Sequence, residues 1–481
     1  MVIQLWEGLN EFYSFFVLVY FILINLTYLT LLITSLPSIL NYIRKNAVFD
    51  YRSILKSELA PSISVLVPAY NEEKSIIQSI HALLKLYYSN LEVVVINDGS
   101  RDSTLQRMIE HFGLVKVHKE FEESLPAAAV RGIYRSTLLP FDKLIVVDKN
   151  NGGKSDALNC GVNIASSKLV CSVDADSILE PDALLRVVKP FIEDSTRVVA
   201  SGGIVRIVDG CEVENGFVKS VHLSKKWLPT FQVNEYLRSF LTGRVGWSAI
   251  NGLMVISGAF GLFDKKTLIK CGGFRTDSIG EDMELVTRIH RILREEKRDY
   301  RVVFVPDPVC WTEAPKDLKT LSRQRNRWHR GLIDTMKLHR KMLFNPRYGV
   351  IGMLAFPYYF IFEMIGPFVE LTGIIFVLLS FYLHIVDVYF FILFLVVAVI
   401  YGIFLSIGAI LLEEYTFHRY PDPKDITRLI AFAFIENLGY RQMTAWWRVK
   451  GGFDYLRGVV TWGAMNRSGF DSKSEKSPAA R

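Results

Sequence analysis

The sequence predicts an α/β fold in which a doubly wound, mainly parallel sheet is flanked by transmembrane and interfacial helices. Between residues 62 and 174, short β-rich runs alternate with helical stretches, which is the pattern of such a sheet. Half of the 481 residues are hydrophobic, and the longest apolar runs lie toward the two ends of the chain. We therefore expect a polar central domain between membrane segments.

An uncharged run near the N-terminus predicts the first membrane helix. Residues 12–42 carry no charged side chain, and roughly 20 apolar residues suffice to span a bilayer. A secretory signal would begin with basic residues, whereas Glu7 and Glu11 precede this run. Four basic residues follow it: Arg44, Lys45, Arg52 and Lys56. By the positive-inside rule, we expect the N-terminus outside and the central domain in the cytoplasm.

A second apolar region, residues 349–412, predicts a hairpin of helices that crosses the membrane and returns, with Asp387 in its loop. The stretch 429–447 mixes apolar residues with Glu436 and Arg441. It therefore suits an interfacial helix as well as a crossing one. Basic residues in the tail favour a cytoplasmic C-terminus.

These segments divide the chain into four expected parts and predict a multi-pass protein of the cell membrane. The parts are an N-terminal transmembrane helix (1–45), a cytoplasmic α/β domain (46–347), C-terminal transmembrane helices (348–412), and an interfacial or transmembrane helix with a cytoplasmic tail (413–481). The lipid bilayer is therefore an expected partner. An accessory membrane or export subunit would be a further one.

Charge and cysteine content exclude other classes of protein. The formal charge of +7 is accounted for by the membrane flanks, and no basic stripe interleaved with aromatic residues supports nucleic-acid binding. The five cysteines are scattered without a CxxC pair. They fit reduced thiols better than disulfides or zinc ligands.

Polar side chains follow three of the predicted strands. They are Tyr70 and Glu72 after strand 63–67, Asp98 after strand 91–96, and Asp174 and Asp176 after strand 168–173. In doubly wound folds, ligands bind beyond the carboxyl ends of the strands, so we expect these side chains on one rim. Carboxylates beside a phosphate substrate require a cation between them, and oxygen ligands suit Mg²⁺ or Mn²⁺.

Each of these features has a simpler interpretation when taken alone. An Asp-x-Asp triplet arises on the order of once by chance in a chain of this length. The run 97–100 is a turn signal, and Tyr70 could be a core aromatic residue. Their shared position at the strand ends of one α/β unit favours a site.

Two further groups lie later in the chain. Glu281 and Asp282 open a helical run, where an acid pair is also a common N-cap. Residues 324–328 lie in a helical segment ahead of the membrane, where basic residues usually contact lipid headgroups. That interpretation does not explain Gln324 and Trp328 among the arginines.

Taken together, these residues resemble the signature of the processive family-2 glycosyltransferases, which include cellulose, chitin, hyaluronan and poly-N-acetylglucosamine synthases. The family motifs D, DxD, (T/E)ED and QxxRW are similar to Asp98, Asp174-Ala175-Asp176, Glu281-Asp282 and Gln324-Arg325-Asn326-Arg327-Trp328. The resemblance covers about residues 62–347 and implies a GT-A fold. One departure is Gly280, where relatives often have Thr.

The resemblance also implies a role for each matching residue. Asp282 is the expected general base on the acceptor hydroxyl, and Lys154 is expected to face the diphosphate. The other donor contacts implied are Tyr70, Glu72, Asp98, Asp174, Gln324, Arg325 and Arg327, with Tyr70 stacking on the base. Asp174 and Asp176 would hold Mg²⁺ or Mn²⁺, and the acceptor contacts would be Glu281, Gly258 and Trp328.

These roles make a coherent reaction. Displacing a nucleoside diphosphate from an anomeric carbon requires a Lewis acid for the leaving group and a base for the incoming hydroxyl. One in-line attack inverts the stereochemistry, so an α-linked UDP-sugar donor and a growing glycan acceptor give a β-linked polysaccharide. Two alternatives remain open: a non-processive transferase that moves one sugar to a lipid acceptor, and a nucleotide-binding membrane scaffold or transporter.

Two acids in the second apolar region remain outside the motifs. Glu363 and Glu370 are seven residues apart, which places both on one face of a helix. Carboxylates are costly against lipid, so this face should contact protein or water. The pair is either structural or lines a polar channel for the polymer, with Gly366 and Pro367 opening the backbone between them.

Overall fold

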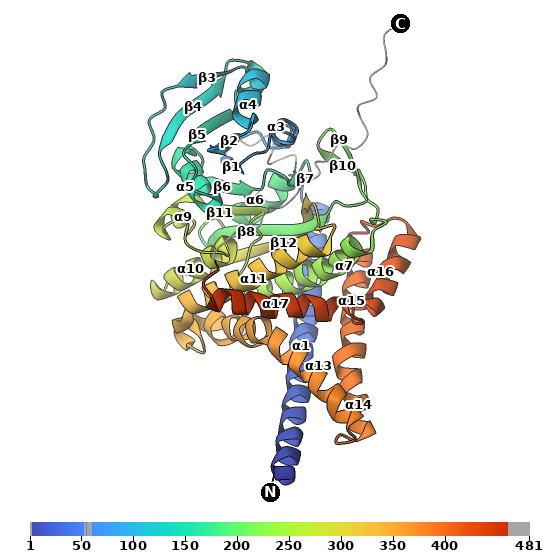
Figure 1. Ribbon diagram of the computed structural model, residues 1–481. Helices are drawn as coiled ribbons and strands as arrows, with labels where there is room; N and C mark the ends of the chain where they lie inside the picture. Colours follow the sequence, from blue (N-terminus) through green and yellow to red (C-terminus); the bar gives the residue numbers. More distant parts are fainter. Residues whose placement is uncertain (1, 52–53, 55–59, 460–481) are drawn as a thin grey trace.

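The computed structural model describes residues 2–51, 54 and 60–459 (Figure 1). Its centre is a ten-stranded sheet with the strand order β3-β4-β5-β2-β1-β6-β11-β8-β12-β7. The strands are β1 (Ile63–Ala69), β2 (Leu91–Asp98), β3 (Leu114–Val117), β4 (Val130–Ser136), β5 (Leu144–Lys149), β6 (Leu169–Val173), β7 (Ile178–Leu179), β8 (Val198–Ile207), β11 (Phe260–Asp264) and β12 (Arg301–Thr312). A separate hairpin pairs β9 (Glu212–Glu214) with β10 (Phe217–Ser220).

The strands predicted from the β-rich runs are confirmed. β5, β2, β1 and β6 are parallel neighbours, and β8 and β12 form another parallel pair. β11 runs antiparallel between β6 and β8. The antiparallel strands β3 and β4 at one end of the sheet were not predicted, because most of their side chains are exposed or only partly buried.

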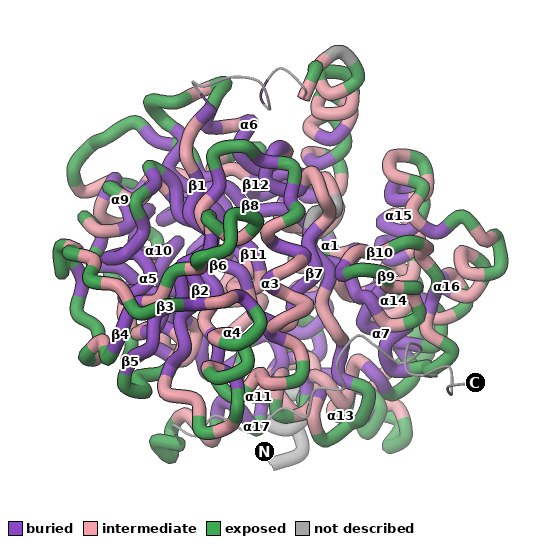
Figure 2. Tube along the Cα trace, turned by 90° about the horizontal axis from the view of Figure 1, so that it is seen from above, coloured by how far each residue is buried: buried purple, intermediate pink, exposed green. Residues whose placement is uncertain are grey.

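Helices cover the sheet and bury it from both sides. Those of the α/β domain are α3 (Ile76–Leu84), α4 (Thr104–Phe112), α5 (Lys154–Ile164), α6 (Ala183–Glu193), α7 (Trp227–Tyr236), α8 (Val245–Ala249), α9 (Lys265–Lys270), α10 (Glu281–Glu295) and α11 (Leu318–Leu338). The residues buried in α3 and α4 recur every three or four positions, as an amphipathic helix requires. Figure 2 shows the buried residues gathered along the central strands.

Among the residues that the structure describes, three helices are long and apolar enough to cross a membrane: Phe12–Ala47, Ile351–Tyr382 and Val388–Thr416. The first is most of α1 (Val2–Val48). The others comprise α12 (Phe356–Tyr358), α13 (Gly366–Tyr382), α14 (Val388–Leu395), α15 (Tyr401–Thr416) and the π-helical segments η5 (Ile351–Ala355), η6 (Tyr359–Ile365) and η7 (Val396–Ile400). The loop expected at Asp387 is confirmed, because its side chain accepts hydrogen bonds from Tyr389 N at 2.6 Å and Phe390 N at 3.1 Å and so caps α14.

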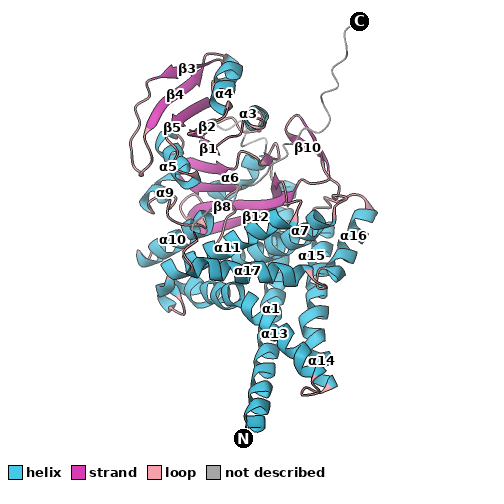
Figure 3. Cartoon of the chain, viewed as in Figure 1, coloured by secondary structure: helices cyan, strands magenta, loops and turns pink. Residues whose placement is uncertain are grey.

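The stretch 429–447, whose path the sequence left open, is divided between two shorter helices. α16 (Pro423–Ile435) and α17 (Tyr440–Leu456) are separated by a turn at Gly439, which has a φ of 107°. Neither is among the candidate membrane spans. α17 packs against α11 and α13, between the sheet and the candidate membrane helices (Figures 1 and 3). This position favours the interfacial alternative. Of the basic tail, residues 460–481 lie outside the described residues, as do Arg52 and Lys56.

Candidate active site

The carboxyl ends of the central strands bring two of the predicted residues, Tyr70 and Asp98, to one edge of the sheet. Ala69 pairs with Asn97, and Asp98 pairs with Lys149, so β1, β2 and β5 end together. Tyr70 follows β1 and is 45% exposed, as a ring available for stacking must be. Asp98 at the end of β2 is only 3% exposed.

The loops after β1 and β2 are joined by hydrogen bonds. Asn71, which has a positive φ of 57°, donates from its N to Ser100 Oγ at 3.0 Å and accepts from Arg101 N at 2.9 Å. The Glu72 N donates to Thr104 Oγ1 at 2.9 Å, and its carboxylate accepts from Ser75 Oγ at 2.7 Å. Residues 97 and 98 still belong to β2, so the predicted turn at 97–100 is reduced to a bend at Gly99, and these hydrogen bonds hold the loop that carries Tyr70.

Lys154, the first residue of α5, lies between two groups of acids. Its Nζ is 2.6 Å from Asp174 Oδ1, 3.5 Å from Glu281 Oε1 and 3.5 Å from the carbonyl of Gly258. Burial disfavours the ammonium, but Asp174 and Glu281 outweigh burial and raise the pKa of Lys154. A permanent cation thus lies beside the first aspartate of the DxD triplet.

Glu281 and Asp282 lie in the first turn of α10, but neither is its N-cap, which is Gly280. The Asp282 Oδ2 accepts a hydrogen bond from Gly258 N at 3.1 Å, and its Oδ1 accepts one from Met283 N at 2.8 Å. Burial, together with the neighbouring Asp282, raises the pKa of Glu281 against the opposing effect of Lys154. The acid pair therefore faces the segment around Gly258 and the Lys154 side chain.

Gly258 lies where a side chain would obstruct this cluster. A Cβ on Gly258 would be 3.1 Å from Lys154 Nζ, 3.6 Å from Glu281 Oε1 and 3.7 Å from Asp282 Cβ. Only a glycine leaves the backbone open between the two groups of acids.

The residues predicted in 324–328 lie on α11 and point in different directions. Arg327 is close enough to Glu281 to oppose the rise of its pKa. Arg325 pairs with Glu235 of α7 at 2.5 Å, and its guanidinium lies 4.6 Å from the Trp328 ring centre. Gln324 Oε1 is buried without a hydrogen-bond partner among the described residues. Arg325 is thus directed toward α7, whereas Arg327 faces the acid pair.

The carboxylates that could hold a divalent cation are few. Among the residues that the structure describes, no group of three or more His, Cys, Asp or Glu side chains could hold a metal ion. Asp174 and Asp176, both partly exposed at the strand end, supply two carboxylates. Mg²⁺ is commonly bound by one or two carboxylates plus substrate phosphates, so these residues fit a cation that the donor diphosphate would complete.

Glu363 and Glu370, the two acids predicted to line a channel, lie away from this cluster, beside α17. Glu363 pairs with Arg448 of α17 at 2.9 Å and accepts a hydrogen bond from Tyr358 OH at 3.0 Å. Arg441 and Arg448 are both within electrostatic range of Glu370. Both acids therefore face the interfacial helix α17, and their role in a channel stays a prediction.

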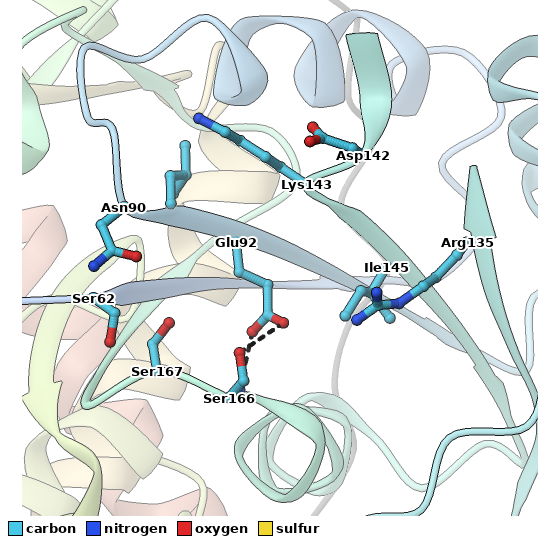
Figure 4. A pocket seen from close by; sticks show the side chains of 10 residues that line it. Ser62, Asn90, Glu92, Arg135, Asp142, Lys143, Ile145, Ser166 and Ser167 are labelled. Atoms are coloured by element: carbon cyan, nitrogen blue, oxygen red, sulfur yellow. Dashed lines mark hydrogen bonds between the residues drawn. The ribbon is translucent and has the colours of Figure 1, made fainter. Parts of the chain in front are cut away.

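A cavity of about 490 Å³ lies at the opposite edge of the sheet (Figure 4). It is formed at the amino ends of β1, β2, β5 and β6. Glu92 there is bound by Ser64 Oγ at 2.6 Å and by Ser166 N and Oγ at 3.0 Å each. The cavity is lined by two acidic residues, Glu92 and Asp142, and two basic ones, Arg135 and Lys143. These charges balance, so they favour neither anionic nor cationic ligands.

Comparison with known proteins identifies the family to which this chain belongs. Residues 60–331 match the model of the glycosyltransferase-like family 2, which covers more than half of the chain. The chain belongs to this family. It is therefore a glycosyltransferase with the α/β fold of GT-A type that the sequence predicted.

Two curated relatives of this glycosyltransferase are poly-β-1,6-N-acetyl-D-glucosamine synthases. The one from Staphylococcus epidermidis is 28% identical over 296 residues, which cover 61% of this chain and 60% of the relative. The one from Staphylococcus aureus (strain COL) is 29% identical over 291 residues and covers 59% of each chain. This glycosyltransferase thus spans about 60% of the length of these relatives.

Among solved structures, a mannosyltransferase from Pyrobaculum calidifontis in complex with GDP-Man and Mn²⁺ is similar to this glycosyltransferase. It is 20% identical, covers 87% of this chain and 99% of its own, and has a TM-score of 0.48.

The sequence did not predict the buried network around Asp98, which includes Lys149, Asn151 and Asp156. Lys149 is fully buried and bonds both Asp98 and Asp156, and Asn151 donates to Asp98. The only signal in the sequence was a charged residue at the end of an apolar strand, followed by a Gly-rich turn. Such a residue is usually exposed, so its burial could not be predicted.

Proposed function

We propose that this glycosyltransferase is an inverting, metal-dependent, processive enzyme that polymerises a β-linked polysaccharide from a UDP-sugar. The observation that carries the proposal is the position of Lys154 between Asp174 and the pair Glu281–Asp282. Donor-side and acceptor-side carboxylates thereby meet around one cation. The proposal also draws on the curated relatives, which are named as synthases of a β-linked N-acetylglucosamine polymer.

On the donor side, the exposed Tyr70 ring would stack on the base, with Glu72 and Asp98 close to the nucleoside. Lys154 would neutralise charge on the diphosphate as the sugar departs, and Gln324 and Arg327 would contribute from α11. Arg325 would contribute only by leaving Glu235. A divalent cation, Mg²⁺ or Mn²⁺, would act as the Lewis acid for the leaving diphosphate, and Asp174 and Asp176 would hold it.

On the acceptor side, Asp282 would take the proton of the attacking hydroxyl. Its Oδ2 bonds only the Gly258 N at 3.1 Å, which orients the carboxylate without protonating it. Glu281, next to Asp282 in the first turn of α10, would form a hydrogen bond with the acceptor. Gly258 would leave room for a sugar ring, and Trp328 would form an apolar floor.

We further propose that the α/β domain lies at the cytoplasmic face of the cell membrane and that the growing glycan passes across the bilayer. Three apolar helices and the position of α17 support this arrangement. Arg44 and Lys45, near the C-terminal end of α1, support this orientation by the positive-inside rule. An accessory membrane or export subunit is compatible with it.

The test is transfer by the purified full chain in nanodiscs with a panel of radiolabelled UDP-sugars and Mn²⁺ or Mg²⁺. We expect UDP-N-acetylglucosamine to be used and the product to be a ladder of long β-linked chains that EDTA abolishes. A single sugar added to a lipid would reject processivity and favour the lipid-acceptor alternative. Nucleotide binding without any sugar turnover would reject the enzyme proposal and favour a scaffold.

A further inference from the structure

A buried network under the active-site edge connects Asp98 to the loop that precedes Lys154. Lys149 ends β5 and has no exposed side-chain surface. Its Nζ donates to Asp98 Oδ1 at 2.6 Å and to Asn150 O at 2.7 Å, and it lies 2.6 Å from Asp156 Oδ1. Burial opposes the ammonium, but the two carboxylates outweigh it and raise the pKa of Lys149.

The loop after Lys149 wraps around the same carboxylate. Gly152 N donates to Asp98 Oδ1 at 3.0 Å, and Gly153 N donates to Asp98 Oδ2 at 2.8 Å. Asn151 Nδ2 donates to the Asp98 carbonyl at 2.7 Å and to its Oδ2 at 3.2 Å. Asp98 thus accepts hydrogen bonds from three consecutive loop residues as well as from Lys149.

Two glycines allow this close approach. Gly99 has a φ of 65°, and a Cβ there would lie 2.8 Å from Asn151 N, so a larger residue would displace the loop. Gly153 has a φ of 88° and turns the chain into α5, whose first residue is Lys154. Asp156, in the first turn of α5, is the other carboxylate bound to Lys149. Its two oxygens also accept hydrogen bonds from Ala128 N at 3.1 and 3.0 Å.

We propose that Lys149 is a positioning residue for Lys154 and that it acts by holding Asp98 and Asp156 against the loop 150–153. Asp98 thus links the nucleoside side of the site, where the proposed function places it, to the loop that precedes Lys154. The inference rests on the proposed function, since it assumes that Lys154 binds the donor diphosphate.

The experiment compares a ligand that has the diphosphate with one that lacks it. Calorimetry with the full chain in nanodiscs, in EDTA, measures UDP affinity, and competition measures uridine affinity. We expect Lys149→Met to weaken UDP binding about tenfold or more, as loss of a charge-assisted contact does, and to weaken uridine binding less, because uridine reaches Asp98 but not Lys154. Equal losses for both ligands would overturn the proposal, as would unchanged UDP affinity.

Lys149→Met leaves two carboxylates without their shared cation and could prevent folding. Asn151→Ala keeps the buried ion network and removes only the contacts of its side chain with Asp98, so it tests the same inference in a folded protein. We expect it to weaken UDP binding more than uridine binding. Asn150→Ala is the matched control, because it is the backbone carbonyl of Asn150 that bonds Lys149. A similar loss in this control would overturn the role of the loop contacts.

Coupling distinguishes positioning from an independent structural effect. If Lys149 acts through Lys154, the combined Lys149→Met and Lys154→Met variant binds UDP as weakly as Lys154→Met alone. Additive losses would contradict the proposal. A wild-type chain that binds no UDP would instead reject the proposed function, so the two failures are separate outcomes.

Discussion

Gly280 and Gly331 bring the first turn of α10 directly against α11. A Cβ on Gly331 would lie 2.9 Å from the Gly280 Cα, and a Cβ on Gly280 would lie 3.0 Å from the Gly331 Cα. The two backbones therefore touch with no side chain between them. This contact explains why Gly280 is present where relatives often have Thr: in this protein a side chain there would separate the acid pair from Arg327.

Gly331→Val is expected to separate α10 from α11. Overpacking at a tight contact typically costs about 1–3 kcal/mol of folding stability. We also expect transfer to fall by at least about tenfold, because Glu281 and Asp282 shift together. Thermal unfolding and transfer rates check both effects. The control is Gly243→Ala, whose Cβ would meet only the Arg238 carbonyl at 3.4 Å; a Gly331 variant as active as this control would contradict the role of the contact.

Asp282→Asn is expected to abolish transfer while nearly preserving UDP affinity. The proposed base acts on the acceptor hydroxyl, and its removal should cost roughly 10²–10⁴-fold in rate. Asn retains an oxygen that can accept the Gly258 N hydrogen bond, so the local structure is kept. Initial rates and UDP calorimetry check the prediction. A variant that keeps more than about half of the wild-type rate would show that Asp282 is not the base.

Asp176→Ala is expected to remove the metal dependence of UDP binding. The cation would connect this carboxylate to the diphosphate, so without it Mn²⁺ should no longer strengthen binding. Calorimetry with UDP, in Mn²⁺ and in EDTA, measures the difference. Asp182→Ala, at the N-cap of α6, is a control acid on the same chain segment. Equal UDP affinities for Asp176→Ala and the wild type under both conditions would reject the metal assignment.

The double change Glu363→Gln and Glu370→Gln is expected to leave UDP binding and the first transfer intact but to shorten the product. Carboxylates on a channel wall would accept hydrogen bonds from sugar hydroxyls, which amides do less strongly. Gel sizing of products after a fixed incubation measures the length. Arg448→Met is the control, because it removes the ion pair with Glu363 but keeps both carboxylates. Unchanged length in a folded double variant would leave only the structural role.

The sequence alone determined the family, the α/β sheet and the edge of the sheet on which the site lies. Apolar runs of strand length between helical stretches required parallel strands, and the polar residues after three of these strands had to meet because parallel strands end together. Long uncharged runs likewise predicted helices long enough to cross a membrane, because backbone polar groups in lipid must be satisfied within the helix.

Only the tertiary structure decided which neighbours each side chain has. It directed Arg325 to Glu235, placed Lys154 between Asp174 and Glu281, and divided the stretch 429–447 at Gly439. The burial of Lys149 could not be predicted either, because a buried ammonium is tolerated only where carboxylates distant in sequence converge on it. Local pattern specifies elements and their faces, whereas ion pairs and close glycine contacts depend on how those elements pack.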